Sequence, residues 1–175
     1  MWNKENSDGT EEERKRNWRP QVVRFGTFRF QARPLAVILA SDVYGYEAPN
    51  LRKLADKVAA AGFYVAKAFE DTKLVISALQ SKGISAIAAA GFCYGAKVVV
   101  ELAKDGLIQA GVLLHPSFVT VDDIKEVKAP MAILGAEIDK LFSPELVKQF
   151  VKIYSSKPEV ASFVKSFLVL LMRGL

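Results

Sequence analysis

Two kinds of segment alternate along most of this chain, and this alternation limits its fold more than any other feature. Apolar runs of strand length are followed by longer stretches in which apolar residues recur at helical spacing. Such units build parallel sheets, because parallel strands need a long crossover between them. We therefore predict an α/β fold, a doubly wound and mostly parallel sheet with helices on both faces. Strands are expected at 35–41, 63–65, 85–92, 110–115, 131–135 and 162–170, and helices at 49–61, 70–81, 95–104, 121–126 and 144–155.

Glycine and proline mark the ends of these helices. Gly62, Gly83 and Gly106 follow predicted helices, at the position where a left-handed C-cap residue belongs. Ser143 and Pro144 are typical of an N-cap followed by proline at the first helical position. Near the start, alternating apolar residues at 21–32 predict a short hairpin.

Composition indicates a single soluble globular domain. The chain has 175 residues, of which 51% are apolar, enough to bury one core. Residues 1–20 combine acidic and basic runs with little to bury, so we expect a disordered tail before a domain at 21–175. The net charge of +5 is spread along helical segments, which argues against a nucleic-acid partner.

The expected compartment is the cytoplasm. One cysteine rules out an internal disulfide, and the first residues carry no apolar signal segment. The apolar run at 167–172 is far shorter than the ~20 residues that a membrane-spanning helix needs, so no membrane partner is expected.

Cys93, the only cysteine, lies between two glycines, Gly91 and Gly95, after a predicted strand and before a predicted helix. Glycines on both sides suit a nucleophile on a sharp strand-to-helix turn, because neighbouring backbone passes close by. The positive end of the helix dipole also lowers the pKa of a thiol. A lone cysteine without such neighbours is most often a small buried apolar residue. The interpretation of Cys93 as a nucleophile therefore depends on the two flanking glycines.

Further groups follow the ends of the neighbouring strands, and the carboxyl ends of parallel strands meet at one edge of the sheet. Asp42 follows the first of these strands, His115 the fourth and Asp139 the fifth. The amides of Val43 and Tyr94 are the natural pair to hold a developing oxyanion. The strand ends therefore predict acyl-transfer chemistry at this edge.

Both acids also have a structural alternative. Asp42 can hydrogen-bond the backbone of its own loop, and Asp139 can be a turn or cap residue, with Glu137 an equally acidic neighbour. One histidine and one cysteine in separate segments do not supply a metal site, and no phosphate-binding glycine motif is present. We therefore expect neither a metal nor a cofactor.

Three motifs in order give the chain a resemblance to the dienelactone hydrolases, which are α/β-hydrolases with a cysteine nucleophile. They are Gly-Phe-Cys-Tyr-Gly-Ala-Lys at 91–97, Leu-Leu-His-Pro-Ser-Phe-Val at 113–119 and Ile-Leu-Gly-Ala-Glu-Ile-Asp at 133–139. The resemblance extends over about three quarters of the chain and is strongest to plant members, some named endo-1,3;1,4-β-D-glucanase. It implies an α/β-hydrolase-like fold and hydrolysis of an ester or lactone through a thioester, without a cofactor.

Position by position, the resemblance implies roles for five residues. Cys93 is the implied nucleophile and Asp139 the triad acid. Val43 and Tyr94 take the oxyanion-hole positions. Asp42 stands where bacterial members have a glutamate that contacts the resting cysteine.

The chain departs from the family in three places. The segment between Val65 and Phe69 is short, the stretch before Leu35 differs, and the resemblance ends after Phe167, before the triad histidine and the final helix. We therefore expect an internally deleted and C-terminally truncated member with an incomplete fold. His115 is interpreted as structural rather than as a substitute base, so turnover is expected to be impaired.

The leading expectation is thus a hydrolase with a small-molecule ester or lactone substrate. The alternative is a non-catalytic product, either a pseudo-enzyme or binding isoform or a truncated chain without turnover. Without a final helix, the last strand is expected to form an uncovered edge, with Phe163 and Phe167 nearby, that favours self-association.

Overall fold

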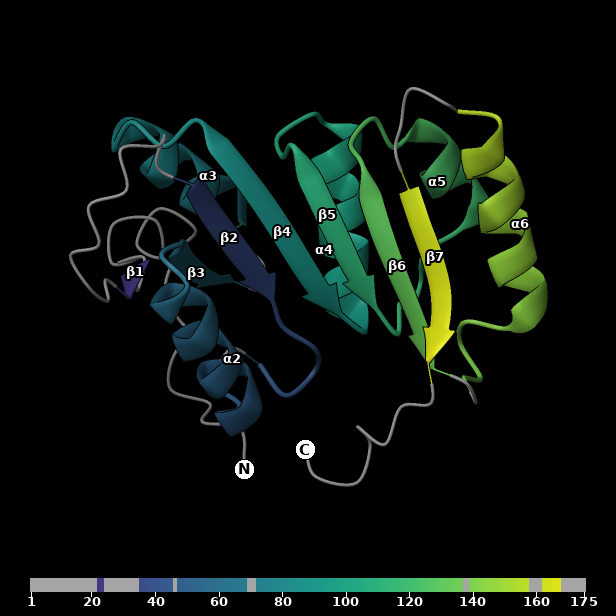
Figure 1. Cartoon of the computed structure of the whole chain (residues 1–175), viewed down its shortest axis with the longest axis horizontal. Helices are drawn as coiled ribbons and strands as arrows, with labels where there is room; N and C mark the ends of the chain where they lie inside the picture. Colours follow the sequence, from purple (N-terminus) through teal and green to yellow (C-terminus); the bar gives the residue numbers. More distant parts are fainter. Residues whose placement is uncertain are drawn as a thin grey trace, which may run out of the picture.

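A single mixed sheet organises the chain, of which the computed structural model describes residues 22–23, 35–45, 47–68, 72–136, 139–157 and 162–167. Its strands lie in the order β1-β3-β2-β4-β5-β6-β7 (Figure 1). Strands β2 to β7 are parallel, and β1 lies antiparallel beside β3. The prediction of a mostly parallel α/β sheet is confirmed.

The elements follow the predicted sequence of strands and helices. The strands are β1 (Val22–Val23), β2 (Leu35–Ala40), β3 (Tyr64–Ala68), β4 (Ala86–Phe92), β5 (Ala110–Leu114), β6 (Met131–Ala136) and β7 (Ser162–Phe167). The helices are α2 (Pro49–Ala60), α3 (Thr72–Ser81), α4 (Tyr94–Lys104), α5 (Val121–Glu126) and α6 (Pro144–Ser155).

Strand β3 is longer than the predicted 63–65. It pairs with β2 along its whole length, from Ala36↔Tyr64 to Ala40↔Ala68, so backbone pairing continues past the apolar run that marked the strand in the sequence. In the segment predicted as a hairpin, the described residues 22–23 pair with β3 instead. The rest of that segment, the predicted tail at 1–20 and the residues after 167 lie outside the described part of the chain.

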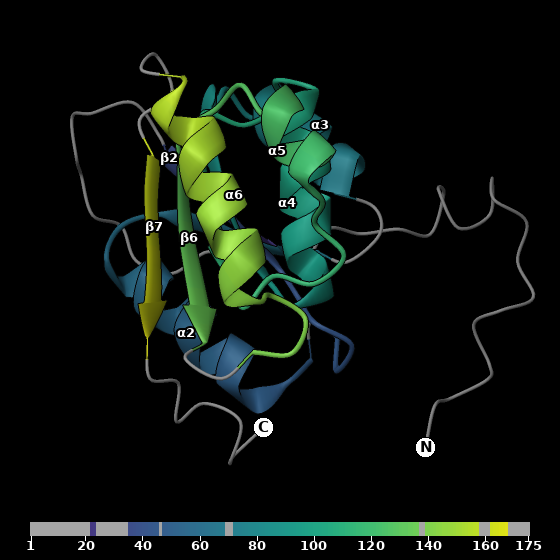
Figure 2. The same ribbon diagram turned by 90° about the vertical axis from the view of Figure 1, so that its right-hand side faces the viewer.

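Helices cover the two faces of the sheet unequally. Helices α3, α4, α5 and α6 pack on one face, and α2 packs on the other (Figures 1 and 2). The larger core lies under the four helices, where Leu79, Val99, Leu113 and Phe150 are completely buried. A smaller cluster joins α2 to β2 and β3.

Strands β5 and β6 show the effect of this unequal cover. Leu113 and Ile133 point to the face with four helices and are fully buried. Val112 and Leu134, which alternate with them along the strands, are only half-buried on the other face. Among the described residues, no helix covers that part of the sheet (Figure 1).

The predicted helix ends are confirmed. Gly62, Gly83 and Gly106 have φ angles of +94°, +79° and +70°, the left-handed conformation that favours glycine after a helix. The Ser143 side chain accepts a hydrogen bond from the Leu146 amide at 3.3 Å and so caps α6. None of the described helices is long and apolar enough to cross a bilayer.

A buried aspartate joins α4 to α5. Asp123 is 6% exposed, and its Oδ1 accepts hydrogen bonds from the ammonium groups of Lys97 at 2.7 Å and Lys104 at 3.3 Å. Its Oδ2 accepts from the amide and the hydroxyl of Thr120, both at 2.9 Å. Burial opposes ionisation of this carboxyl, but the hydrogen bonds from Lys97 and Thr120 outweigh it and hold the pKa of Asp123 well below its usual range.

Replacing this carboxylate should destabilise the protein, since it leaves two lysines without their buried partner. We expect Asp123→Ala to lower the free energy of unfolding by about 2–4 kcal/mol, measured by urea denaturation at pH 7. Because the pKa of Asp123 is lower in the folded state, the stability difference between the wild type and Asp123→Ala should be at its full size above pH ~4. It should shrink as the pH falls further. Asp122→Ala is the control, because that neighbouring side chain is exposed; an equal loss in both variants would contradict a special role for Asp123.

Candidate functional site

The turn from β4 into α4 holds Cys93 in an unusual backbone conformation. Its φ is +51° and its ψ is −113°, a region that residues with a side chain rarely adopt. Three hydrogen bonds fix it: the Cys93 amide donates to the Leu114 carbonyl at 3.1 Å, and the Cys93 carbonyl accepts from the amides of Ala96 at 3.2 Å and Ser117 at 3.1 Å. The half-buried thiol is thereby held at the carboxyl end of the sheet.

The two flanking glycines permit this turn because backbone passes close to both. A Cβ on Gly91 would collide with the carbonyl of Gly95. A Cβ on Gly95 would collide with the carbonyls of Ala40 and Ser41 at the end of β2. The close approach expected from the sequence is therefore present on both sides of Cys93.

A buried hydroxyl lies beside the thiol. The Oγ of Ser117 is 3.4 Å from the Sγ of Cys93, and Ser117 is 1% exposed. Among the described residues, this hydroxyl is the one hydrogen-bond partner of the thiol. Ser117 lies within a motif that the sequence singled out, but no local pattern marked it as a neighbour of Cys93.

The loop after β5 is strained on both sides of Ser117. His115 has a φ of +38° and Phe118 a φ of +59°. The His115 amide donates to the Leu134 carbonyl at 2.7 Å, which ties the start of the loop to β6. The ring of Phe118 meets the ring of Tyr94 edge to face, with centroids 6.0 Å apart. The loop therefore touches the start of α4 both at the thiol and at the following residue.

The loop after β2 places the other predicted oxyanion donor at this edge. The Asp42 Oδ1 accepts the Tyr44 amide at 2.9 Å, and the Asp42 carbonyl accepts the Gly45 amide at 3.1 Å. Asp42 thus fills the structural role offered as the alternative from the sequence: it hydrogen-bonds the backbone of its own loop. No acceptor among the described residues takes the Val43 amide, and the Val43 side chain is exposed.

Asp139 follows β6 and is half-buried. Its Oδ1 accepts the amides of Leu141 at 2.9 Å and Phe142 at 3.0 Å, so this acid also organises its own turn. Its neighbour Glu137 lies outside the described residues. These hydrogen bonds hold the carboxylate in a fixed orientation.

The predicted residues follow four strands that are adjacent in the sheet, β2, β4, β5 and β6, and so share one edge. Within the described part of the chain, no hydrogen bond joins the Cys93 thiol to Asp42, His115 or Asp139. The same part contains no group of three or more histidine, cysteine, aspartate or glutamate side chains that could hold a metal ion.

Large apolar side chains are exposed around this edge. They come from the loops after β2, β5 and β6, at the same edge of the sheet as Cys93. They are Val43 (71% exposed), Tyr44 (66%), Phe118 (70%) and Leu141 (61%).

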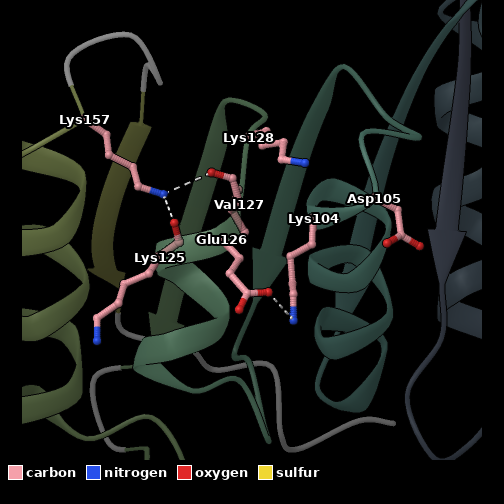
Figure 3. A pocket seen from close by; sticks show the side chains of 7 residues that line it. All are labelled: Lys104, Asp105, Lys125, Glu126, Val127, Lys128 and Lys157. Atoms are coloured by element: carbon pink, nitrogen blue, oxygen red, sulfur yellow. Dashed lines mark hydrogen bonds and ion pairs between the residues drawn. The ribbon is translucent and has the colours of Figure 1, made fainter.

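A charged depression of about 520 Å³ lies at the opposite edge of the sheet, where α4 ends and β6 and β7 begin (Figure 3). Its lining is Lys104, Asp105, Lys125, Glu126, Val127, Lys128 and Lys157. Lys104 pairs with Glu126 at 3.1 Å, and Lys157 donates to main-chain carbonyls at the end of α5 (Figure 3). These contacts join α4, α5 and the residues that follow α6, so we interpret the depression as structural.

Comparison with known proteins identifies the class of this molecule. The fold resembles a structure described as a dienelactone hydrolase from Klebsiella pneumoniae, with a TM-score of 0.67 and 16% identity over 79% of this chain and 76% of the other. It also resembles the Pyrococcus furiosus esterase Pf2001, with a TM-score of 0.64 and 16% identity over 77% and 74% of the two chains. The architecture is that of an α/β-hydrolase.

Sequence comparison is more specific. The dienelactone hydrolase family model matches residues 65–167. An endo-1,3;1,4-beta-D-glucanase from Zea mays is 41% identical over 151 residues, covering 71% of this chain and 50% of the relative. Hydrolase pyvD from Aspergillus violaceofuscus is 26% identical, covering 63% of this chain and 58% of the relative. The chain belongs to the dienelactone hydrolase family, and it spans between half and three fifths of the length of these two relatives.

Gly95, two residues after Cys93, gives a direct test of the packing at this turn. We expect Gly95→Ala to lower the free energy of unfolding by about 2–3 kcal/mol, because the new methyl group meets backbone carbonyls that cannot move aside. Gly83→Ala is the matched control: its Cβ meets nothing, and only its positive φ should cost about 1 kcal/mol. Thermal or urea denaturation measures both, and an equal loss would contradict the steric argument.

Proposed function

We propose that this chain reacts with small ester or lactone substrates through Cys93, forming a thioester on the protein. The observation that carries the proposal is the backbone of Cys93, held at a φ of +51° between two glycines at the carboxyl edge of the sheet. This backbone conformation costs free energy for a residue with a side chain, and residues in such conformations are concentrated at functional sites. Membership of a hydrolase family supports the same chemistry.

The proposed reaction begins with the thiolate of Cys93, whose proton has passed to solvent. Its sulfur forms a bond to the carbonyl carbon of the substrate, and the carbonyl oxygen becomes an oxyanion. The amides of Val43 and Tyr94 are the proposed donors to that oxyanion. The bond from carbon to the leaving oxygen then breaks, the alcohol takes a proton from water, and the acyl group remains on Cys93.

Release of the acyl group demands more of the protein. Water must lose a proton as it attacks the thioester, and a positioned base accelerates such a step by about 10²–10⁴. The chain has one histidine, His115, and no described hydrogen bond links it to Cys93 or Asp139. We therefore propose that, in this 175-residue chain, acylation of Cys93 is much faster than hydrolysis of the thioester. Asp139 is the proposed acid of the site.

Cleavage of a glucan, the activity named for the maize relative, is not proposed for this site. Glycoside hydrolysis uses two carboxyl groups facing the scissile bond. The described acids in the β2 and β6 loops at this edge are Asp42, Glu47 and Asp139. Asp42 and Asp139 accept backbone amides within their own turns, and Glu47 is exposed and pairs with Arg52. A cysteine on a strained turn serves acyl transfer rather than glycoside chemistry.

The exposed apolar residues support a preference for apolar acyl groups. The Phe118 ring contacts Tyr94, the residue next to the nucleophile, and is 70% exposed. An acyl chain bound to Cys93 beside this ring would remove apolar surface from water.

The first test follows the reaction of the full chain with excess p-nitrophenyl acetate. We expect a burst of about one equivalent of p-nitrophenolate per chain, then slow release, because a thioester forms and then persists. Intact mass spectrometry should show one added acetyl group on the wild type. Cys93→Ala should give neither signal, and incubation with mixed-linkage β-glucan should release no reducing sugar. An absent burst, or an equal burst in Cys93→Ala, would contradict the proposal.

The second test concerns acyl selectivity. We expect the wild type to react faster with p-nitrophenyl butanoate than with the acetate, and Phe118→Ala to reduce this ratio by about 3- to 10-fold through lost apolar contact. Phe63→Ala is the matched control, since Phe63 is exposed but precedes β3 at the opposite edge of the sheet. A ratio unchanged in Phe118→Ala would remove that ring from the proposed acyl site.

A further inference from the structure

Ser117 presents its hydroxyl to the candidate nucleophile from inside the protein. The side chain is 1% exposed, and its Oγ lies 3.4 Å from the Cys93 Sγ. A buried hydroxyl that lacks a partner is costly, and in the described part of the chain the thiol is the partner of this hydroxyl. The pair is therefore coupled: a change in the charge of the sulfur changes the strength of the hydrogen bond.

The backbone fixes the position of that hydroxyl. The Ser117 amide donates to the Cys93 carbonyl at 3.1 Å, so the two residues are joined at the main chain as well as at the side chain. The residues around it, His115 and Phe118, have φ angles of +38° and +59°. The surrounding structure therefore holds this loop in a strained form that brings Ser117 against the nucleophile.

We infer that Ser117 is a positioning residue that donates a hydrogen bond to the Cys93 thiolate and favours the ionised form of that sulfur. In the neutral pair either group can donate. When the thiol ionises, its proton passes to solvent and the hydroxyl turns to donate to the anion, without transferring its own proton. Hydrogen bonds to charged groups are stronger than those between neutral groups, so the contact favours the thiolate. This inference rests on the proposed role of Cys93 as nucleophile.

The test measures ionisation of Cys93 without any ester. Iodoacetamide reacts with the thiolate: a bond forms from sulfur to carbon, iodide leaves, and the thiol proton passes to the buffer. Because the chain has one cysteine, the alkylation rate followed from pH 5 to 11 reports on Cys93 alone. For Ser117→Ala we expect the midpoint of this profile to rise by about 0.5–1, and the rate at pH 7 to fall about 3- to 10-fold. The rate at high pH should stay within about twofold.

A matched control is available at the next strand end. Ser41 is also 1% exposed, and its hydroxyl has no hydrogen-bond partner among the described residues. Ser41→Ala removes the same group at the same burial and should leave the midpoint unchanged. Ser117→Thr keeps the hydroxyl and should restore the wild-type midpoint, and Ser117→Gly repeats the test if the alanine variant fails to fold.

The outcomes separate this inference from the proposed function. A midpoint that stays the same or falls in Ser117→Ala, or that rises equally in Ser41→Ala, overturns the inference even when ester acylation succeeds. A rise confined to the variants that lack the Ser117 hydroxyl supports the inference, even when p-nitrophenyl acetate gives no burst and the proposed function fails.

Discussion

The close contact of three backbone segments at Gly95 determines the geometry of the whole candidate site. The start of α4 approaches the end of β2 so closely that no Cβ fits on Gly95, and it approaches Gly91 in β4 in the same way. Cys93, with a φ of +51° and a ψ of −113°, lies between these two close contacts. The thiol, the Tyr94 amide and the end of β2 are thereby brought to one place.

Backbone strain is concentrated at this edge. In the described part of the chain, the residues other than glycine with positive φ are Cys93, His115 and Phe118. They belong to two neighbouring turns, after β4 and β5, which share hydrogen bonds between Cys93, Leu114 and Ser117. Each such residue costs of order 1–3 kcal/mol, so surrounding packing must hold the two turns in place. The large core under α3 to α6 provides that support.

The turn at Cys93 is well formed, but the described helices cover the two faces of the sheet unequally. The family match at 65–167 includes the turn at Cys93, the β5 loop and Asp139, whereas the β2 loop with Asp42 and Val43 lies outside it. The chain nevertheless spans only about half the length of its maize relative. On the face opposite the large core, described residues of β5 and β6 such as Val112 and Leu134 are half-buried, and among the described helices α2 alone packs on that face.

The sequence by itself determined the order of strands and helices, the helix caps and the turn at Cys93, because hydrophobic spacing and glycine positions act over a few residues. It also placed Asp42, Asp139 and His115 at strand ends, since parallel strands share an edge. It did not find Ser117 beside the thiol or Phe118 against Tyr94, because residues 24 positions apart meet only when β4 and β5 pair in register. Only the tertiary structure decided these contacts, and it also extended β3 along β2 beyond its apolar run, because a strand ends where its partner stops pairing.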